Sequence, residues 1–228
     1  MTADTDPGSW RDRVRDPALT AMLIVQCFII FLAGPFVAAG YYGSRLAMEV
    51  SGLAFALLVI LVARSPVATV IAAAATFFTL AGSSLSFFLP ATALLPIFVH
   101  IGSIGSFSVV GYVVGSAVFA PGAVTGHRIL GAIVLYLNFG MMIGTGYRVL
   151  WDFIPGSLSG IPSGTEPWQA AGTILYFSFV TLTTVGFGDL VPVHPLARGL
   201  ANLEGVIGQL YPATILARLI TLQLDARR

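Results

Sequence analysis

The residues with the clearest capacity for chemistry form one short run, Thr184-Val185-Gly186-Phe187-Gly188, here called the carbonyl run. Glycine at alternate positions allows backbone conformations that other residues avoid, so successive carbonyl oxygens can turn toward one axis. Such oxygens can replace the water shell of a cation, and the Thr184 hydroxyl can add one more oxygen at the inner end. The run therefore favours the binding of a cation by neutral oxygens.

The segments around the carbonyl run fit that chemistry. Residues 168–182 are apolar and rich in hydroxyl groups, and Glu166-Pro167 ahead of them predicts a capped helix with proline at its first position. After the run, the polar break 189–195 leads into a long apolar stretch. A helix, a loop of free carbonyls and a second helix is the order that a membrane pore needs.

The run and its setting resemble the potassium-channel family, whose filter is a Thr-Val-Gly-Tyr-Gly loop. The resemblance covers residues 152–222 and departs from the family at Phe187, which stands in the tyrosine position. It implies a selectivity filter in the carbonyl run, with potassium bound at Thr184, Val185, Gly186 and Phe187. No carboxylate lies within the run, where a ring of carboxylates would indicate calcium or sodium instead.

Phe187 also bears on the stability of the filter. The missing hydroxyl removes one possible hydrogen bond to the supporting helix, worth about 1 kcal/mol. We therefore expect a filter that loses conduction readily at low potassium concentration.

Three residues are expected at the mouth of the filter and around it. Asp189 follows Gly188 directly, and it either concentrates cations at the mouth or accepts a hydrogen bond behind the filter. Tyr176 and Phe177 match positions that are aromatic in similar channels, so we expect both to pack around the filter.

Glu204 lies in the last apolar stretch, where an unpaired carboxylate is costly. We expect it to brace the filter through hydroxyl groups such as those of Ser178 or Thr183. The alternative is that Glu204 lines the water-filled route, and Gln209 could do either.

Gly208 and Pro212 indicate a bend in the same stretch. Gly208 lies near the position where similar channels keep a glycine hinge, and Pro212 cannot donate a hydrogen bond to the Gly208 carbonyl. The pair predicts either a gating hinge or a static kink.

Composition places the whole chain in a membrane. Of 228 residues, 57% are hydrophobic and only 9% are charged, far from the balance of a soluble domain. The net charge of +1 argues against a nucleic-acid partner. The lone Cys27 excludes an internal disulfide, and three distant histidines with no nucleophile motif argue against an enzyme. We expect no cofactor besides permeant potassium.

The apolar pattern predicts an all-α membrane protein with a re-entrant helix and filter between its fifth and sixth spans. Gly34-Pro35 predicts a kink in the first span. The predicted spans are 18–39, 46–63, 67–89, 95–119, 129–151 and 196–222. They divide the chain into a cytoplasmic or interfacial segment (1–17), a four-helix domain (18–125) and a pore domain (126–228).

The positive charges predict orientation and argue against voltage sensing. All 11 are arginines, and most lie on the inner face if both termini are cytoplasmic. Between Leu89 and His127 there is no Arg or Lys, although voltage sensors need several in the fourth span. His100, which lies there, is expected to be a packed or hydrogen-bonded histidine rather than a sensor.

The carbonyl run occurs once, and a closed ring of carbonyls needs about four copies. We therefore predict a homotetramer in lipid that conducts potassium passively, most simply in a prokaryotic plasma membrane. The alternatives are a potassium transporter subunit and a non-conducting membrane scaffold.

Overall fold

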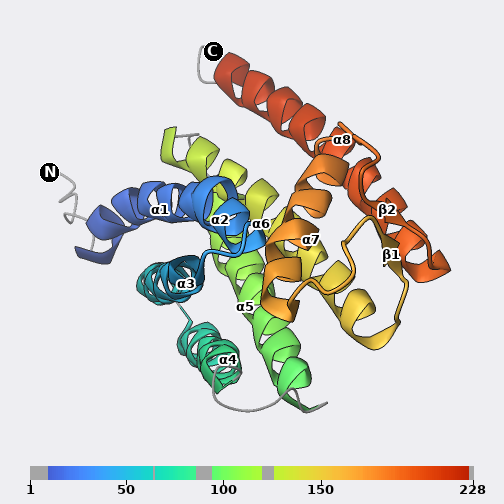
Figure 1. Ribbon diagram of the computed structural model, residues 1–228. Helices are drawn as coiled ribbons and strands as arrows, with labels where there is room; N and C mark the ends of the chain where they lie inside the picture. Colours follow the sequence, from blue (N-terminus) through green and yellow to red (C-terminus); the bar gives the residue numbers. More distant parts are fainter. Residues whose placement is uncertain (1–9, 64, 86–93, 120–125, 226–228) are drawn as a thin grey trace, which may run out of the picture.

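The structure is a computed structural model that describes residues 10–63, 65–85, 94–119 and 126–225 (Figure 1). Long helices dominate these residues, which confirms the predicted all-helical architecture. The N-terminal helical elements are α1 (Trp10–Phe28), η1 (Ile29–Ala33), α2 (Gly34–Ala38), α3 (Tyr42–Val62), α4 (Pro66–Leu85) and α5 (Leu94–Val118). They are followed by α6 (Gly126–Phe153), β1 (Leu158–Ser159), α7 (Pro167–Leu182), β2 (Val191–Pro192) and α8 (Pro195–Asp225).

Five segments among the described residues are long and apolar enough to cross a membrane. They are Pro17–Ala38, Tyr42–Val62, Pro66–Leu85, Leu95–Ser116 and Arg128–Phe153. These segments correspond to the first five predicted spans, although the predicted end of the third span lies outside the described residues. Helix α8 is not among these five segments. The predicted count of six spans is therefore not confirmed.

The first span is one continuous helical rod with a local irregularity. Helix α1 begins at Trp10 and passes through Pro17, so residues 10–17 are helical and run directly into the span. The π-helical turn η1 lies immediately before Gly34-Pro35. Pro35 has no amide hydrogen and cannot donate the hydrogen bond that an α-helix needs at this position. The π-helical turn therefore lies next to the kink that Gly34-Pro35 predicted.

The N-terminal helices pack on one another and on α6. Helix α1 contacts α3 and α6, α4 contacts α5, and α5 contacts α6. Small residues allow this close approach: a methyl group on Gly102 of α5 would lie 2.8 Å from the Ala75 carbonyl oxygen of α4. A shared apolar core joins α1, α3, α5 and α6 and includes Met22, Val59, Val114 and Val134.

Helix α7 lies among α2, α6 and α8 (Figure 1). Its bounds agree within one residue with the helix predicted over 168–182. A methyl group on Gly172 would lie 2.4 Å from the Gly34 carbonyl oxygen, so α2 and α7 touch backbone to backbone. The antiparallel pair of β1 and β2 joins the loop after α6 to the segment after the carbonyl run.

Candidate ion-binding site

The backbone of the carbonyl run alternates in the sign of φ. Thr184, Gly186 and Gly188 have φ values of 59°, 56° and 78°, whereas Val185 and Phe187 are not in this left-handed region. Such alternation turns successive peptide units so that their carbonyl oxygens lie on one side of the chain. Thr184 is the one described non-glycine residue with positive φ. Because that conformation costs about 1–3 kcal/mol, neighbouring contacts must stabilise it.

The amides of the run point back into α7. Thr184 N–H donates to the Thr181 carbonyl at 2.9 Å, and the amides of Val185 and Gly186 donate to the Val180 carbonyl at 3.0 and 3.3 Å. The described residues donate no backbone hydrogen bond to the four carbonyls that begin at Thr184. The run therefore presents a row of exposed, unpaired oxygens at the C-terminal end of α7, where the helix dipole favours a cation.

A buried carboxylate lies behind α7. Glu204 of α8 is 0% exposed, and it accepts hydrogen bonds from Tyr147 OH on one oxygen (2.8 Å) and from Ser178 Oγ on the other. Ser178 Oγ also lies 2.7 Å from the Gly140 carbonyl, so its single hydrogen is shared between two acceptors. These contacts join α6, α7 and α8 at one point. Thr183, the other expected partner of Glu204, instead donates to the Phe179 carbonyl at 2.7 Å.

The contact of Tyr147 with Glu204 was not predicted from the sequence. Its ring packs edge-on against Phe177, with the ring centres 4.8 Å apart, and its side chain is fully buried. Phe177 therefore contacts α6, and its expected packing around the filter stays a prediction. The available signal was a tyrosine hydroxyl inside an apolar helix, because a buried hydroxyl needs a polar partner.

Asp189 makes a hydrogen bond at the end of the run. It accepts a hydrogen bond from Tyr176 OH at 2.9 Å, and both side chains are exposed. One carboxylate oxygen of Asp189 thus accepts a hydrogen bond, while the residue remains exposed at the end of the carbonyl run.

At the opposite end of the run, α8 contacts Thr184 and the last residue of α7. Gln209 Nε2 donates to Thr184 Oγ1 at 2.8 Å, and Gln209 is exposed. A methyl group on Gly208 would lie 1.8 Å from the Leu182 carbonyl oxygen. The close packing of α8 on the end of α7 therefore requires glycine at position 208, whether or not α8 bends there. Pro212 lies inside the continuous helix α8, and the hinge at Gly208 and Pro212 stays a prediction.

Among the residues that the structure describes, no three His, Cys, Asp or Glu side chains lie close enough together to hold a metal ion.

Residues 128–223 match a family model described as "Ion channel". No curated protein and no solved structure matches the chain. The matched segment includes nearly all of α6, the whole of α7, the carbonyl run and most of α8, which are the elements that build the candidate site. Residues 128–223 are therefore similar to ion-channel domains, and the five apolar helices indicate a multi-pass membrane protein.

Proposed function

We propose that the chain is one subunit of a potassium-selective channel that conducts passively down the electrochemical gradient. The observation that carries this proposal is the alternating φ of the carbonyl run, which leaves unpaired carbonyl oxygens on one side of the chain. Neutral oxygens in this number and spacing suit potassium, whose dehydration they can offset. In this reading, α7 is a re-entrant pore helix and α8 is the sixth span that lines the pore.

A homotetramer follows from the single carbonyl run, since about four runs are needed to surround an ion. The exposed apolar side chains of α8 support this assembly, because they have no covering in a single chain. Leu203, Val206 and Leu210 are 50–58% exposed and recur at helical spacing. We propose that these side chains pack against neighbouring subunits and lipid around the pore.

We further propose that the channel is insensitive to voltage and lies in a plasma membrane with both termini cytoplasmic. The basis is the distribution of arginines, with none between Leu89 and His127. A steep activation curve that carries several elementary charges would contradict this part of the proposal.

The experiment is flux from purified protein in potassium-loaded lipid vesicles. We expect potassium flux that sodium does not replace, and we expect Gly186→Ala to abolish it. A methyl group on Gly186 meets no atom within 4 Å, so that substitution acts through the positive φ alone. Gly156→Ala is the matched control, because Gly156 has φ 77° and equally open surroundings in the loop after α6. It should retain flux.

Equal potassium and sodium fluxes, or a protein that remains monomeric in mild detergent, would overturn the proposal. Unitary current steps separate the channel from a potassium transporter subunit. A folded oligomer without any flux would indicate a membrane scaffold instead.

A further inference from the structure

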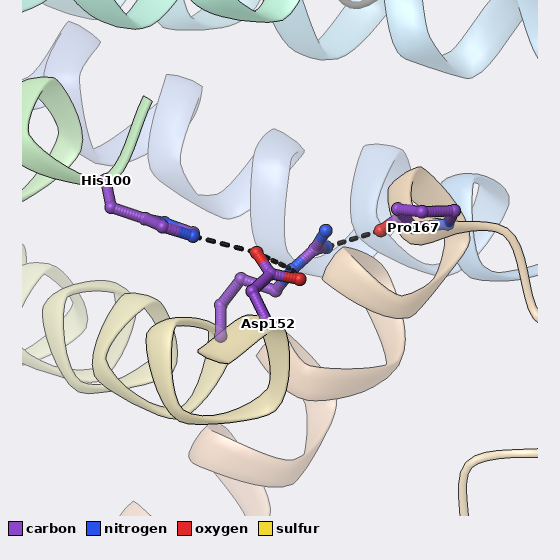
Figure 2. A network of polar contacts seen from close by, with 4 residues as sticks. His100, Asp152 and Pro167 are labelled. Atoms are coloured by element: carbon purple, nitrogen blue, oxygen red, sulfur yellow. Dashed lines mark hydrogen bonds and ion pairs between the residues drawn. The ribbon is translucent and has the colours of Figure 1, made fainter. Parts of the chain in front are cut away.

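A chain of polar contacts connects α5 to the start of α7 and lies apart from the carbonyl run (Figure 2). His100 Nε2 of α5 lies 2.8 Å from Asp152 Oδ2, at the end of α6. Arg148 Nε lies 3.0 Å from each oxygen of the same carboxylate. Arg148 Nη1 also donates a hydrogen bond to the carbonyl of Pro167, the first residue of α7.

These side chains are shielded from water, which strengthens their contacts relative to those at an open surface. The side chains of His100, Asp152 and Arg148 are 9%, 12% and 17% exposed. The His100 ring also meets Phe153, and the guanidinium of Arg148 lies over Trp151. The chain of contacts formed by His100, Asp152, Arg148 and Pro167, here called the relay, therefore has a defined geometry on both the α5 and the α6 sides.

Arginine is required at the centre of this relay. Its planar group presents donors in different directions, so Nε can bind Asp152 while Nη1 binds Pro167. Lysine has one ammonium group at the end of a flexible chain and does not reproduce that fork. A cation at a helix N-terminus is also unfavourable by itself, and Asp152 compensates for that charge.

The relay ends at the first residue of α7 and can therefore position the start of that helix. The capping box of Glu166 and Gln169 sets the residue at which α7 begins, but its contacts lie within the start of the helix and do not connect Pro167 to α6. Arg148 ties that first residue to α6, and His100 ties the same carboxylate to α5. Because the carbonyl run follows α7 directly, a shift at the start of the helix reaches the run through a single rigid element.

We propose that Arg148 is a positioning residue for the filter, and that His100 couples the N-terminal helices α1–α5 to it through Asp152. This inference rests on the proposed potassium conduction. The N-terminal helices thereby act on conduction at the first turn of α7. Neither His100 nor Arg148 contacts the permeating ion.

The test measures potassium flux as a function of potassium concentration in four variants of the full chain. We expect Arg148→Lys and His100→Leu each to raise the potassium concentration for half-maximal flux at least about threefold. His100→Gln should stay close to the wild type, because its side-chain amide can still donate to Asp152. The double variant His100→Leu/Arg148→Lys should be no worse than the more severe single variant, since both act through one carboxylate.

Arg198→Lys is the matched control. Arg198 Nε donates to the Pro192 carbonyl at 3.1 Å, so it is another arginine bound to a proline carbonyl, but it lies outside the relay. Its substitution should leave the potassium dependence unchanged. The unfolding temperature of each variant is measured in parallel.

Three results would overturn the relay while leaving conduction intact. They are an unchanged potassium dependence in His100→Leu and Arg148→Lys, additive effects in the double variant, and a lower unfolding temperature without any change in potassium dependence. A wild-type protein that passes no potassium would instead defeat the proposed conduction itself.

Discussion

The two ends of α7 are fixed in different ways. Its C-terminal half is buried against α6 and α8, with Ser178 and Leu182 both 0% exposed. There the backbone of α8 at Gly208 lies so close to the Leu182 carbonyl that no methyl group fits between them. The buried Glu204 also accepts hydrogen bonds from two hydroxyl groups. Contacts of this kind transmit small displacements directly, because densely packed interiors respond to changes as small as one methylene.

The first turn of α7, ahead of the backbone contact between Gly172 and α2, is fixed by long polar and aromatic side chains from other helices. Arg148 of α6 binds the Pro167 carbonyl, and the guanidinium of Arg45 in α3 lies 5.3 Å from the ring centre of Trp168. The Tyr42 ring lies 5.4 Å from the same tryptophan. Such side chains can change rotamer without moving a backbone. The comparison indicates a rigid end next to the carbonyl run and an adjustable end next to the N-terminal helices.

The largest effect is expected at the rigid end, from Gly208→Ala. The added methyl group would overlap the Leu182 carbonyl, and such overpacking costs about 1–3 kcal/mol in each subunit. We expect a marked loss of assembled oligomer, measured by size-exclusion chromatography after a temperature series. Gly205→Ala on the same helix is the control, since a methyl group there meets no atom of the chain within 4 Å. If both variants assemble alike, the close contact at Leu182 does not fix this end.

The buried carboxylate gives the next test of the rigid end. Glu204→Gln preserves the side-chain shape but presents one acceptor oxygen in place of two, so the Tyr147 and Ser178 hydroxyls can no longer both donate to residue 204, and Ser178 retains the Gly140 carbonyl. Loss of a hydrogen bond to a charged group costs about 1.5–3 kcal/mol. We expect a lower unfolding temperature, followed by tryptophan fluorescence. Tyr147→Phe removes one of the two bonds and should have a smaller effect, whereas an unchanged Glu204→Gln would show that the carboxylate is dispensable.

The smallest effect is expected at the adjustable end, from Trp168→Leu. This change removes the aromatic face beneath Arg45, an interaction worth about 0.5–1 kcal/mol at an exposed site. We expect a small decrease in unfolding temperature with flux retained, and Trp168→Phe should recover most of it. A loss as large as that of Gly208→Ala would mean that both ends of α7 are equally rigid.

Much of the architecture was predictable because its signals are local. The start and end of α7 follow from Glu166-Pro167 and from the glycines after Leu182, and the apolar lengths of five spans agree with the described helices. The Arg148–Asp152 pair also carries a local signal, since residues four apart meet on one face of a helix. The sequence analysis counted Arg148 only as a charge that marks orientation.

The sequence by itself determined the helices, the carbonyl run and the need for backbone flexibility at Gly186 and Gly188, because each depends on neighbouring residues. Only the tertiary structure decided which polar groups meet. His100 and Asp152 are 52 residues apart, and Tyr147 and Glu204 are 57 apart. Those pairings depend on the rotation and depth of whole helices relative to one another. The periodicity of apolar residues constrains helix rotation and helix depth only loosely here, because the helices of this chain are apolar on most faces.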